Sequence, residues 1–398
     1  FGNPFTWNFR AVAAVVDGLG AIDAGTVTLP AEREARAKAF GYFVLGLAHG
    51  TVAILYDQGY IYDPSIDREN VELRPYNEVM DAALGYFDQA IQYAQGQNFS
   101  IPSSWMSRET SAADLVRISH SMKARYRAAV ARTPAERDAV NWNAVIADVD
   151  AGVQSTWQMN LDYTNWWSSF VYYSHLLGWS QLNYHVLGMA DQSGQYQRWV
   201  ARAPGDKHPN LSADQQGDPF LIVTPDTRFP QGSTQAQQDA NPGTKWIIPT
   251  QGPGAQWAQP GRGTWRWSYY RNVEFANWMA NDGLFDEISR TEMNLLKAEG
   301  LVRSGGSLGD AAAIVNQTRT AAGLNATDAS GTNTSCVPRL PNGECGGLLE
   351  MLKWEKRLET QYSGMLHATW YFDSRGWGDL AEGSFLQIPM PERELELL

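Results

Sequence analysis

The sequence has few of the charged, sulfur-containing and imidazole side chains on which many functions depend. Only 2 of its 398 residues are Cys and 6 are His, and charged residues make up 19% of the chain. No Lys/Arg cluster occurs, and the net charge is -12 with a pI near 5.0. Nucleic acids and anionic lipid headgroups require a basic face, so we expect no nucleic-acid partner and no adhesion to such lipids. A neutral ligand suits this charge best.

Long apolar runs are also missing. No run approaches the ~20 residues that a membrane span needs. The chain starts at Phe1 without Met and without a signal peptide, so we expect its natural start to have been processed or to precede this sequence. Any N-terminal lipid anchor would belong to that segment.

The His residues show no metal-binding or catalytic spacing. They are scattered and form no H-E-x-x-H pattern: His49, His120, His175, His185, His208 and His367. The segment Gly305–Gly309 matches G-x-S-x-G, but a nucleophile elbow follows a strand, whereas a helical pattern precedes this match. Ser307 is better explained as a helix N-cap. Walker and dinucleotide motifs are missing too, so we expect no metal, no cofactor and no catalytic residue.

One group of carboxylates could suit a glycosidase, which needs two of them at the right separation. Asp373, Asp379 and Glu382 flank Trp377. A structural interpretation competes with this one, because Asp373 can pair with Arg375. We favour the structural interpretation.

The two cysteines, Cys336 and Cys345, flank the segment VPRLPNGE, whose Pro and Gly residues indicate a turn. Two Cys so close across a turn can form a local disulfide, which would suit an oxidising, extracytoplasmic compartment. The alternative is a pair of free thiols in a cytosolic loop. We predict the disulfide.

Helical patterns fill both ends of the chain. Side-chain caps, Pro at first helical positions and apolar residues at i, i+3 and i+4 mark the segments. We predict helices from Pro30 to Tyr56, Tyr76 to Ala94, Ser111 to Ala129, Thr133 to Val153, Glu287 to Arg303, Ser307 to Ala322 and Gly347 to Tyr362. Short helices paired by tight turns indicate tetratricopeptide-like stacking, although the exact repeat pattern is absent.

The central region differs in character. Periodicity fades between about residues 155 and 284, and Gly, Pro, Gln, Asn and Asp become frequent. Most of the 16 Trp lie in this stretch. So long an irregular segment within a folded domain is usually functional.

Several segments carry motifs that are informative by their order. The C-terminal ones are LLKAEGLVRSGGSLGDAAAIVNQTRTAAGL (Leu295–Leu324), WEKRLETQYSGMLHATWYFDSR (Trp354–Arg375) and the Pro-rich tail IPMPERELE (Ile388–Glu396). Weaker ones are EREARAKAFGYFVLGLAHG, RPYNEVMDAALGYFDQAI and TPDTRFP, the last at Thr224–Pro230. Each motif is degenerate, but their order along the chain is specific, and together they resemble the SusD/RagB family of outer-membrane lipoproteins.

This resemblance implies a mainly α, SusD-like fold with tetratricopeptide-like helix pairs and a large irregular, aromatic-rich loop region. A single domain would span residues 1–398, with N-terminal helical pairs at 1–154, an irregular ligand-facing region at 155–284, and C-terminal helical pairs and tail at 285–398.

The resemblance also implies a non-catalytic protein that captures glycans or other nutrients and delivers them to a TonB-dependent outer-membrane transporter. Such a protein would lie on the extracellular face of the outer membrane, lipid-anchored through an N-terminal segment. A glycoside hydrolase on a helical scaffold and a structural surface protein that forms assemblies are the alternatives.

Two aromatic clusters carry the ligand-binding hypothesis, because sugar C–H faces stack on Trp and Tyr rings whose polar edges stay wet. They are NWWSSFVYYSHLLGW (165–179) and GTWRWSYYRN (263–272). A doublet such as Trp166-Trp167 cannot face inward twice on one strand, so one ring is a candidate for the surface. We predict ligand contacts from Trp166, Trp167, Tyr172, Tyr173, Trp265 and Trp267. The competing interpretation is that most of these rings belong to the core.

Overall fold

The fold is mainly helical, as predicted, and its strands are short. The computed structural model describes residues 3–168, 171, 181–203, 220–247, 267–274, 282–364 and 369–395. The chain divides into two compact units. Unit 1 comprises residues 1–159, 285–304 and 366–398, and unit 2 comprises residues 160–284 and 305–365. The predicted irregular region 155–284 falls almost entirely in unit 2.

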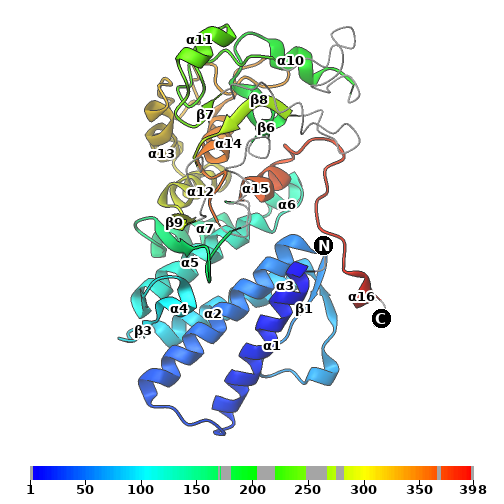
Figure 1. Ribbon diagram of the computed structural model, residues 1–398, viewed down its shortest axis with the longest axis vertical. Helices are drawn as coiled ribbons and strands as arrows, with labels where there is room; N and C mark the ends of the chain where they lie inside the picture. Colours follow the sequence, from blue (N-terminus) through cyan, green and yellow to red (C-terminus); the bar gives the residue numbers. More distant parts are fainter. Residues whose placement is uncertain are drawn as a thin grey trace. The chain divides into compact units, whose positions relative to one another are not determined.

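Unit 1 is built from helices that pack side by side. The three longest, α1 (Asn3–Asp23), α2 (Ala31–Leu55) and α3 (Tyr76–Ala94), lie next to one another (Figure 1). The other helices are α4 (Ser103–Met106), α5 (Ala112–Ala129), α6 (Pro134–Asp138), α7 (Trp142–Ala151), α12 (Arg290–Arg303), α15 (Thr369–Trp377), α16 (Glu392–Leu395) and the 3-10 turn η1 (Arg68–Asn70). Two small antiparallel pairs accompany them: β1 (Gln58–Tyr60) with β2 (Leu73–Pro75), and β3 (Ser100–Ile101) with β4 (Thr110–Ser111).

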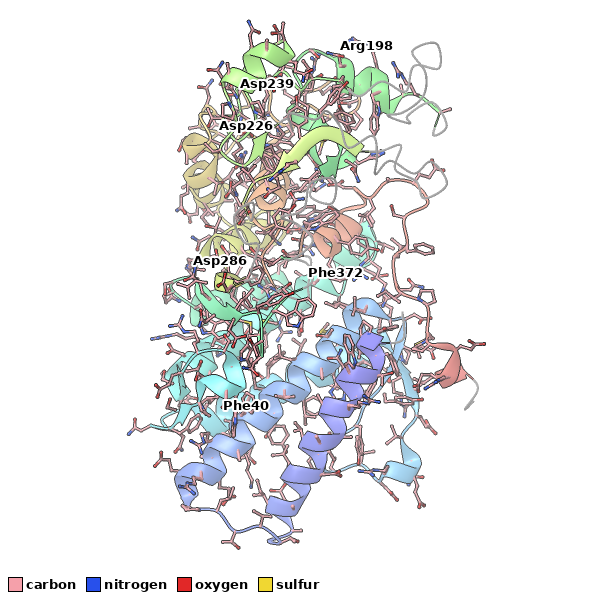
Figure 2. The ribbon with its side chains drawn as sticks, viewed as in Figure 1. Phe40, Arg198, Asp226, Asp239, Asp286 and Phe372 are labelled. Atoms are coloured by element: carbon pink, nitrogen blue, oxygen red, sulfur yellow. A yellow bond between two sulfur atoms is a disulfide. The ribbon has the colours of Figure 1, made fainter. Side chains whose placement is uncertain are left out.

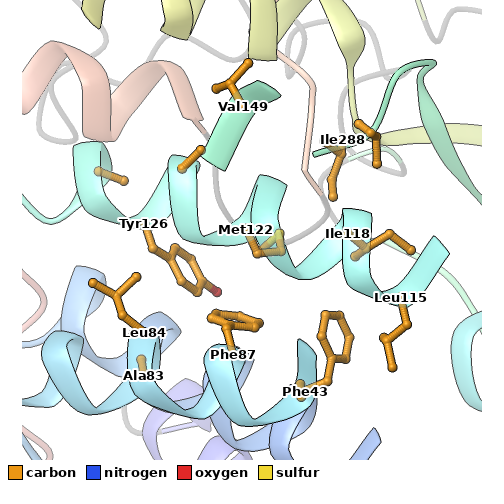
Figure 3. Close-up of a cluster of buried hydrophobic side chains, with 14 of the residues drawn as sticks. Phe43, Ala83, Leu84, Phe87, Leu115, Ile118, Met122, Tyr126, Val149 and Ile288 are labelled. Atoms are coloured by element: carbon orange, nitrogen blue, oxygen red, sulfur yellow. The ribbon is translucent and has the colours of Figure 1, made fainter. Parts of the chain in front are cut away.

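The core of unit 1 lies where α2 and α3 face α5. Phe43, Phe87 and Tyr126 point toward one another there, with Met122 beside them (Figure 3). The Phe43 and Phe87 rings are 5.8 Å apart, edge to face, and the Phe87 and Tyr126 rings are 5.9 Å apart. Each of these side chains comes from an apolar position repeated every three or four residues, so the helical period itself builds the core.

Unit 2 combines short helices with a small antiparallel sheet. In this sheet β8 (Trp267–Asn272) lies between β6 (Gln181–Asn183) and β7 (Trp246–Ile247). Its helices are α9 (Tyr184–Leu187), η2 (Gly188–Ala190), α10 (Gln195–Val200), α11 (Gln235–Ala240), α13 (Leu308–Ala321) and α14 (Leu348–Glu359). A further pair of strands, β5 (Trp157–Asp162) and β9 (Asp282–Ile288), spans the boundaries between the two units along the chain. Gln158 in β5 donates to Asp286 in β9 at 2.8 Å (Figure 2 labels Asp286).

The predicted helices are confirmed, with two differences. The helix expected from Thr133 to Val153 is two helices, α6 and α7, because the side chain of Asn141 accepts from the Ala144 N–H and starts a new helix. The helix expected from Glu287 starts after Ser289, which caps α12, and the preceding residues belong to β9. Helices α1 and α15 were not predicted.

Helix α2 is long and apolar enough to span a membrane by length and composition, although no run of that kind was expected from the sequence. In the structure 67% of its most apolar window is buried inside the protein. Its residues from Ala39 onward supply much of the unit 1 core, so burial against α1 and α3 accounts for its apolar character.

A buried arginine joins three helices of unit 1. Arg137 in α6 donates to both carboxylate oxygens of Glu299 in α12, at 2.9 and 2.6 Å, and to Asp373 in α15 at 2.9 Å. Glu299 also accepts from Arg303 and from the indole N–H of Trp377. Removing one partner of such a pair typically lowers the free energy of unfolding by about 3–5 kcal/mol, because the remaining charge stays buried without compensation.

Arg375 does not bind as the sequence suggested, because Asp373 is engaged by Arg137. Arg375 donates instead to the carbonyls of Ile54 and Ala129, at 2.9 and 2.8 Å, in the last turns of α2 and α5. Arg132 binds another carbonyl in the last turn of α2 at 3.2 Å. Cations at these positions satisfy carbonyls that lack partners within the helix and complement the helix dipole.

His49 fastens a surface segment to α2. The ring is fully buried; its Nε2 accepts from the Tyr62 N–H at 3.2 Å, which leaves Nδ1 to donate to the Leu45 carbonyl at 2.8 Å. Burial lowers the pKa of His49 to about 4. The neutral imidazole is therefore the form that the fold accommodates.

We predict that unit 1 loses stability as His49 is forced to take up a proton. The folded-state pKa lies below the unfolded value near 6.5, so the unfolded chain binds more protons and the free energy of unfolding falls as the pH drops from 6.5 toward 4. Between pH 7 and pH 5 the loss should be about 2 kcal/mol. Urea titrations across this range measure it, with His49→Gln as the matched control. An identical pH dependence in both proteins would contradict the assignment.

Cys336 and Cys345 are joined as a disulfide across a turn in unit 2, and their Cα atoms are 4.7 Å apart. Arg339 and Cys345 face each other as an antiparallel bridge, and Gly343 takes a positive φ of 90° at the tip.

We predict that titration of the denatured, unreduced protein finds no free thiol. Closing a loop of 9 residues should stabilise the fold by roughly 2–3 kcal/mol, because it restricts the unfolded chain. Reduction should lower the melting temperature accordingly. Two reactive thiols before reduction would refute the bridge.

Candidate functional site

A tight turn follows β5 in unit 2 and is organised by one carboxylate. Asp162 accepts from the backbone N–H groups of Thr164, Asn165 and Trp166 at 2.9, 2.8 and 2.9 Å. The Asp162 N–H donates back to the Trp166 carbonyl at 2.9 Å and closes the turn. The N–H groups of Trp166 and Thr164 lower the pKa of Asp162 to about 2. The turn therefore keeps its charged anchor throughout the physiological pH range.

This turn presents two aromatic rings to solvent. Tyr163 adopts a left-handed backbone conformation with φ of 58°, and its side chain is 53% exposed. Trp167 is 48% exposed, whereas Trp166 is half-buried. The Tyr163 and Trp167 rings lie 6.4 Å apart at 61°. We call this pair, with the polar residues Thr164 and Asn165 between them, the aromatic shelf.

The chemistry of the shelf suits a hydroxyl-rich ligand. Exposed rings offer an apolar face to sugar C–H groups, and the phenol and indole edges can bond hydroxyls. The hydroxyl of Thr164 and the amide of Asn165 lie between the rings in sequence. Both donate to Asp162, at 3.3 and 3.5 Å, and their oxygens can accept from ligand hydroxyls. The tight turn keeps two large rings beside each other and largely in solvent, so they are candidates for ligand contacts.

The structure describes the positions of three of the six predicted ligand-binding residues, Trp166, Trp167 and Trp267. Trp166 and Trp167 lie together on the turn, and the doublet places one ring outward, as the sequence argument required. Trp267 is the first residue of β8, opposite Asn183 of β6. Tyr172, Tyr173 and Trp265 lie outside the described residues.

Tyr163 is a candidate that the sequence argument missed. The pattern Asp162–Tyr163–Thr164–Asn165 could have indicated it, because an Asp followed by polar residues favours an Asx turn. A side chain within such a turn is commonly exposed to solvent. Tyr163 is a single ring outside the two aromatic clusters, so the density of aromatic residues does not mark it.

Other aromatic residues of the central region belong to the core of unit 2, as the competing interpretation proposed. Trp199, Trp246, Tyr184 and Tyr270 are almost completely buried. The Tyr184 hydroxyl donates to the Phe220 carbonyl at 2.6 Å. Rings buried in this way contribute packing and are poor candidates for ligand contacts.

The residues of the two catalytic alternatives, Ser307 and the group around Trp377, have structural contacts in the protein. Ser307 accepts from the Asp310 N–H at 3.1 Å and caps α13, as expected for a helix start. Trp377 is buried and donates to Glu299, and Asp373 is paired with Arg137, so neither side chain is open to a sugar. Asp379 is half-buried and Glu382 is exposed. Within the described ranges no three His, Cys, Asp or Glu residues are placed to hold a metal ion.

Sequence comparisons found no match, either among models of known families or among curated proteins. Solved structures are similar over nearly the whole chain. Surface glycan-binding protein A from Bacteroides uniformis is 13% identical, with 100% of this chain and 83% of that chain covered, at a TM-score of 0.55. A SusD superfamily protein from Bacteroides vulgatus is 12% identical, with 98% of this chain and 83% of that chain covered, at a TM-score of 0.54. NanU from B. fragilis is 11% identical, with 96% of this chain and 80% of that chain covered, at a TM-score of 0.51. The chain has a SusD-like fold, as the resemblance implied.

We predict that Asp373→Asn lowers the stability of the protein, and that neither the native protein nor the variant hydrolyses polysaccharides. The change weakens the neutralisation of buried Arg137, which should cost roughly 1–3 kcal/mol. Denaturant titration measures the loss, and release of reducing sugar from polysaccharides should stay at background in the native protein and the variant. Steady release by the native protein that Asp373→Asn abolishes would overturn the structural assignment.

Proposed function

We propose that this protein is a non-catalytic surface protein that captures glycans through the aromatic shelf. The observation that carries the proposal is the exposed Tyr163/Trp167 pair, which the Asp162 turn holds in place. A ligand that stacks on both rings would bury apolar surface that the folded chain leaves in water. Hydrogen bonds to Thr164 and Asn165 would then set the orientation of the sugar.

Two further observations support this function. The SusD-like fold is shared with a protein described as surface glycan-binding, at an identity that carries the fold alone. The low charged content of 19% and the net charge of -12 also favour a neutral ligand over an anionic one. The catalytic alternative has no such support, since Asp373 is paired with Arg137 in the core.

Delivery to a partner completes the proposal. By its resemblance to the SusD/RagB family, the protein would act at the outer face of the outer membrane and pass its glycan to a TonB-dependent transporter. Lipid anchoring through an N-terminal segment would keep it there. Copurification of a transporter with the native protein from detergent-solubilised membranes tests this part independently of the shelf.

We predict that Trp167→Ala and Tyr163→Ala each weaken glycan binding about tenfold to a hundredfold, as expected for loss of a strong aromatic contact. The ligand is first identified on a glycan array and then titrated by calorimetry. Melting temperatures should stay near the native value, because both rings are about half exposed. Trp7→Ala is the matched control: Trp7 is 62% exposed in α1, so its loss should leave binding unchanged.

The other predicted residues are tested in the same way, namely Trp166, Tyr172, Tyr173, Trp265 and Trp267. A ring that contacts the ligand lowers affinity at unchanged stability, whereas a core ring lowers the melting temperature because it leaves a cavity. Unchanged affinity in both shelf variants would sink the proposal. A change of molecular mass in solution, with no change in affinity, would favour subunit assembly instead.

A further inference from the structure

An open cavity in unit 1 offers a second candidate site. A cavity of about 550 Å³ opens between the end of α1, the middle of α2, α3 and the segment that follows β1. Its walls come from Asp23, Tyr42, Ile61, Asp63, Pro64, Ser65, Ala82, Gly85, Tyr86 and Gln89. This volume falls within the usual range for small-molecule sites, roughly 300–1,000 Å³.

The floor of the cavity is kept bare by small residues of α3. Ala82 and Gly85 lie one turn apart there, and a Cβ built on Gly85 would meet nothing within 4 Å. Gly is among the poorest helix formers, yet no close approach and no positive φ requires it at this position. Its effect in the structure is to leave the cavity open.

Aromatic rings form one wall. The Tyr42 ring is stacked on Tyr93 at 5.6 Å and 8°, and it lies 6.5 Å from Tyr86 at 29°. These contacts fix the ring of Tyr42, which is half-buried and borders the cavity. A ring held rigidly in this way can stack on an apolar ligand face without losing further side-chain entropy.

The segment that follows β1 contributes a fixed carboxylate to the cavity. Asp63 accepts from the Tyr86 hydroxyl at 2.9 Å and from the backbone and side chain of Ser65 at 2.8 and 2.6 Å. The preceding residue, Tyr62, is tied to buried His49, so the whole segment is anchored on α2. Among the described residues no ion pair involves Asp63.

The charges of the cavity define the ligand class. Lys38 pairs with Asp23 and Glu34 at 2.9 and 3.0 Å, so its charge is already compensated. The polar groups left facing the cavity are mainly acceptors, and the negative charge of Asp63 disfavours an anion. The complement is a small ligand with several O–H or N–H donors and one apolar face.

We propose that this cavity binds a single sugar unit, neutral or carrying an amino group, and that it rejects acidic sugars. The inference rests on the proposed function in taking the ligand to be a saccharide, but it concerns a separate site. Tyr42 would stack against the C–H face of the ring, and Asp63 and the Gln89 amide would bond its hydroxyl or amino groups.

The decisive variant is Gly85→Leu, which fills the cavity from a position where the helix has room. Gly18→Leu is the matched control: it makes the same change within α1, a Cβ there also meets nothing within 4 Å, and Gly18 does not border the cavity. Both variants should fold, with melting temperatures equal to or above that of the native protein. Glucose, N-acetylglucosamine, glucosamine and glucuronate are presented to each protein, and binding is followed by saturation-transfer NMR.

We expect at least one neutral or amino sugar to give a signal that Gly85→Leu abolishes and Gly18→Leu retains, and glucuronate to give none. Asp63→Asn should weaken the same binding about tenfold, since it replaces charge-assisted hydrogen bonds with neutral ones. No sugar signal, a signal indifferent to Gly85→Leu, or equal binding of glucuronate would each overturn the proposal.

Repeating the measurement in the Tyr163→Ala/Trp167→Ala double variant separates the two sites. If the shelf binds no ligand, the double variant keeps both the sugar signal of the cavity and the polysaccharide affinity of the native protein. If the cavity is inert, Gly85→Leu has no effect, while the double variant still loses polysaccharide binding. Failure of either proposal can therefore be distinguished from failure of the other.

Discussion

The structure depends on burying a few charges with partners that are distant in sequence. In unit 1, Arg137 is neutralised by Glu299 and Asp373, which lie 162 and 236 residues further along the chain. In unit 2, Arg228 pairs with its near neighbour Asp226 and with Glu355, which lies 127 residues further along the chain. Trp354 also donates to Asp226 (Figure 2 labels Asp226). Because an unpaired buried charge is so costly, each cluster admits only the arrangement in which the distant segments meet.

Two of the segments that resemble the SusD/RagB family contain members of these clusters. The segment TPDTRFP, one of the weaker matches, contains Asp226 and Arg228, and the segment Trp354–Arg375 contains Glu355 and Asp373. Their side chains are therefore held in buried ion pairs, in a chain whose sequence identity to similar structures is only 11–13% in the examples compared.

Local rules predicted most of the helices, and their failures have local causes. Ser111, Thr133 and Ser307 cap helices where expected, because a side-chain acceptor before an amphipathic run is a short-range signal. The break at Asn141 was missed since the apolar period continues across it, and only the cap geometry shows that α7 starts afresh. The later start of α12 was missed because residues up to Ile288 belong to β9. The pairing of β9 with β5 is a long-range contact that local sequence signals do not show.

The candidate sites were predictable to different degrees. The exposure of Trp167 followed from its doublet, whereas Tyr163 depends on a turn conformation set by Asp162. Nothing in the sequence placed Tyr42, Asp63 and Gly85 around one cavity, because they come from two helices and a connecting segment. That site requires the tertiary packing of α2 against α3 and the tether at His49.

The central claim is that the shelf holds a glycan, and the indole N–H signals of the protein test it most directly. The Trp167 signal is assigned by its disappearance in Trp167→Phe, and the native protein is titrated with the oligosaccharide that a glycan array selects. The account predicts that the Trp167 signal shifts in proportion to saturation, while those of buried Trp199 and Trp246 stay in place. Saturable binding with an unmoved Trp167 signal would contradict it.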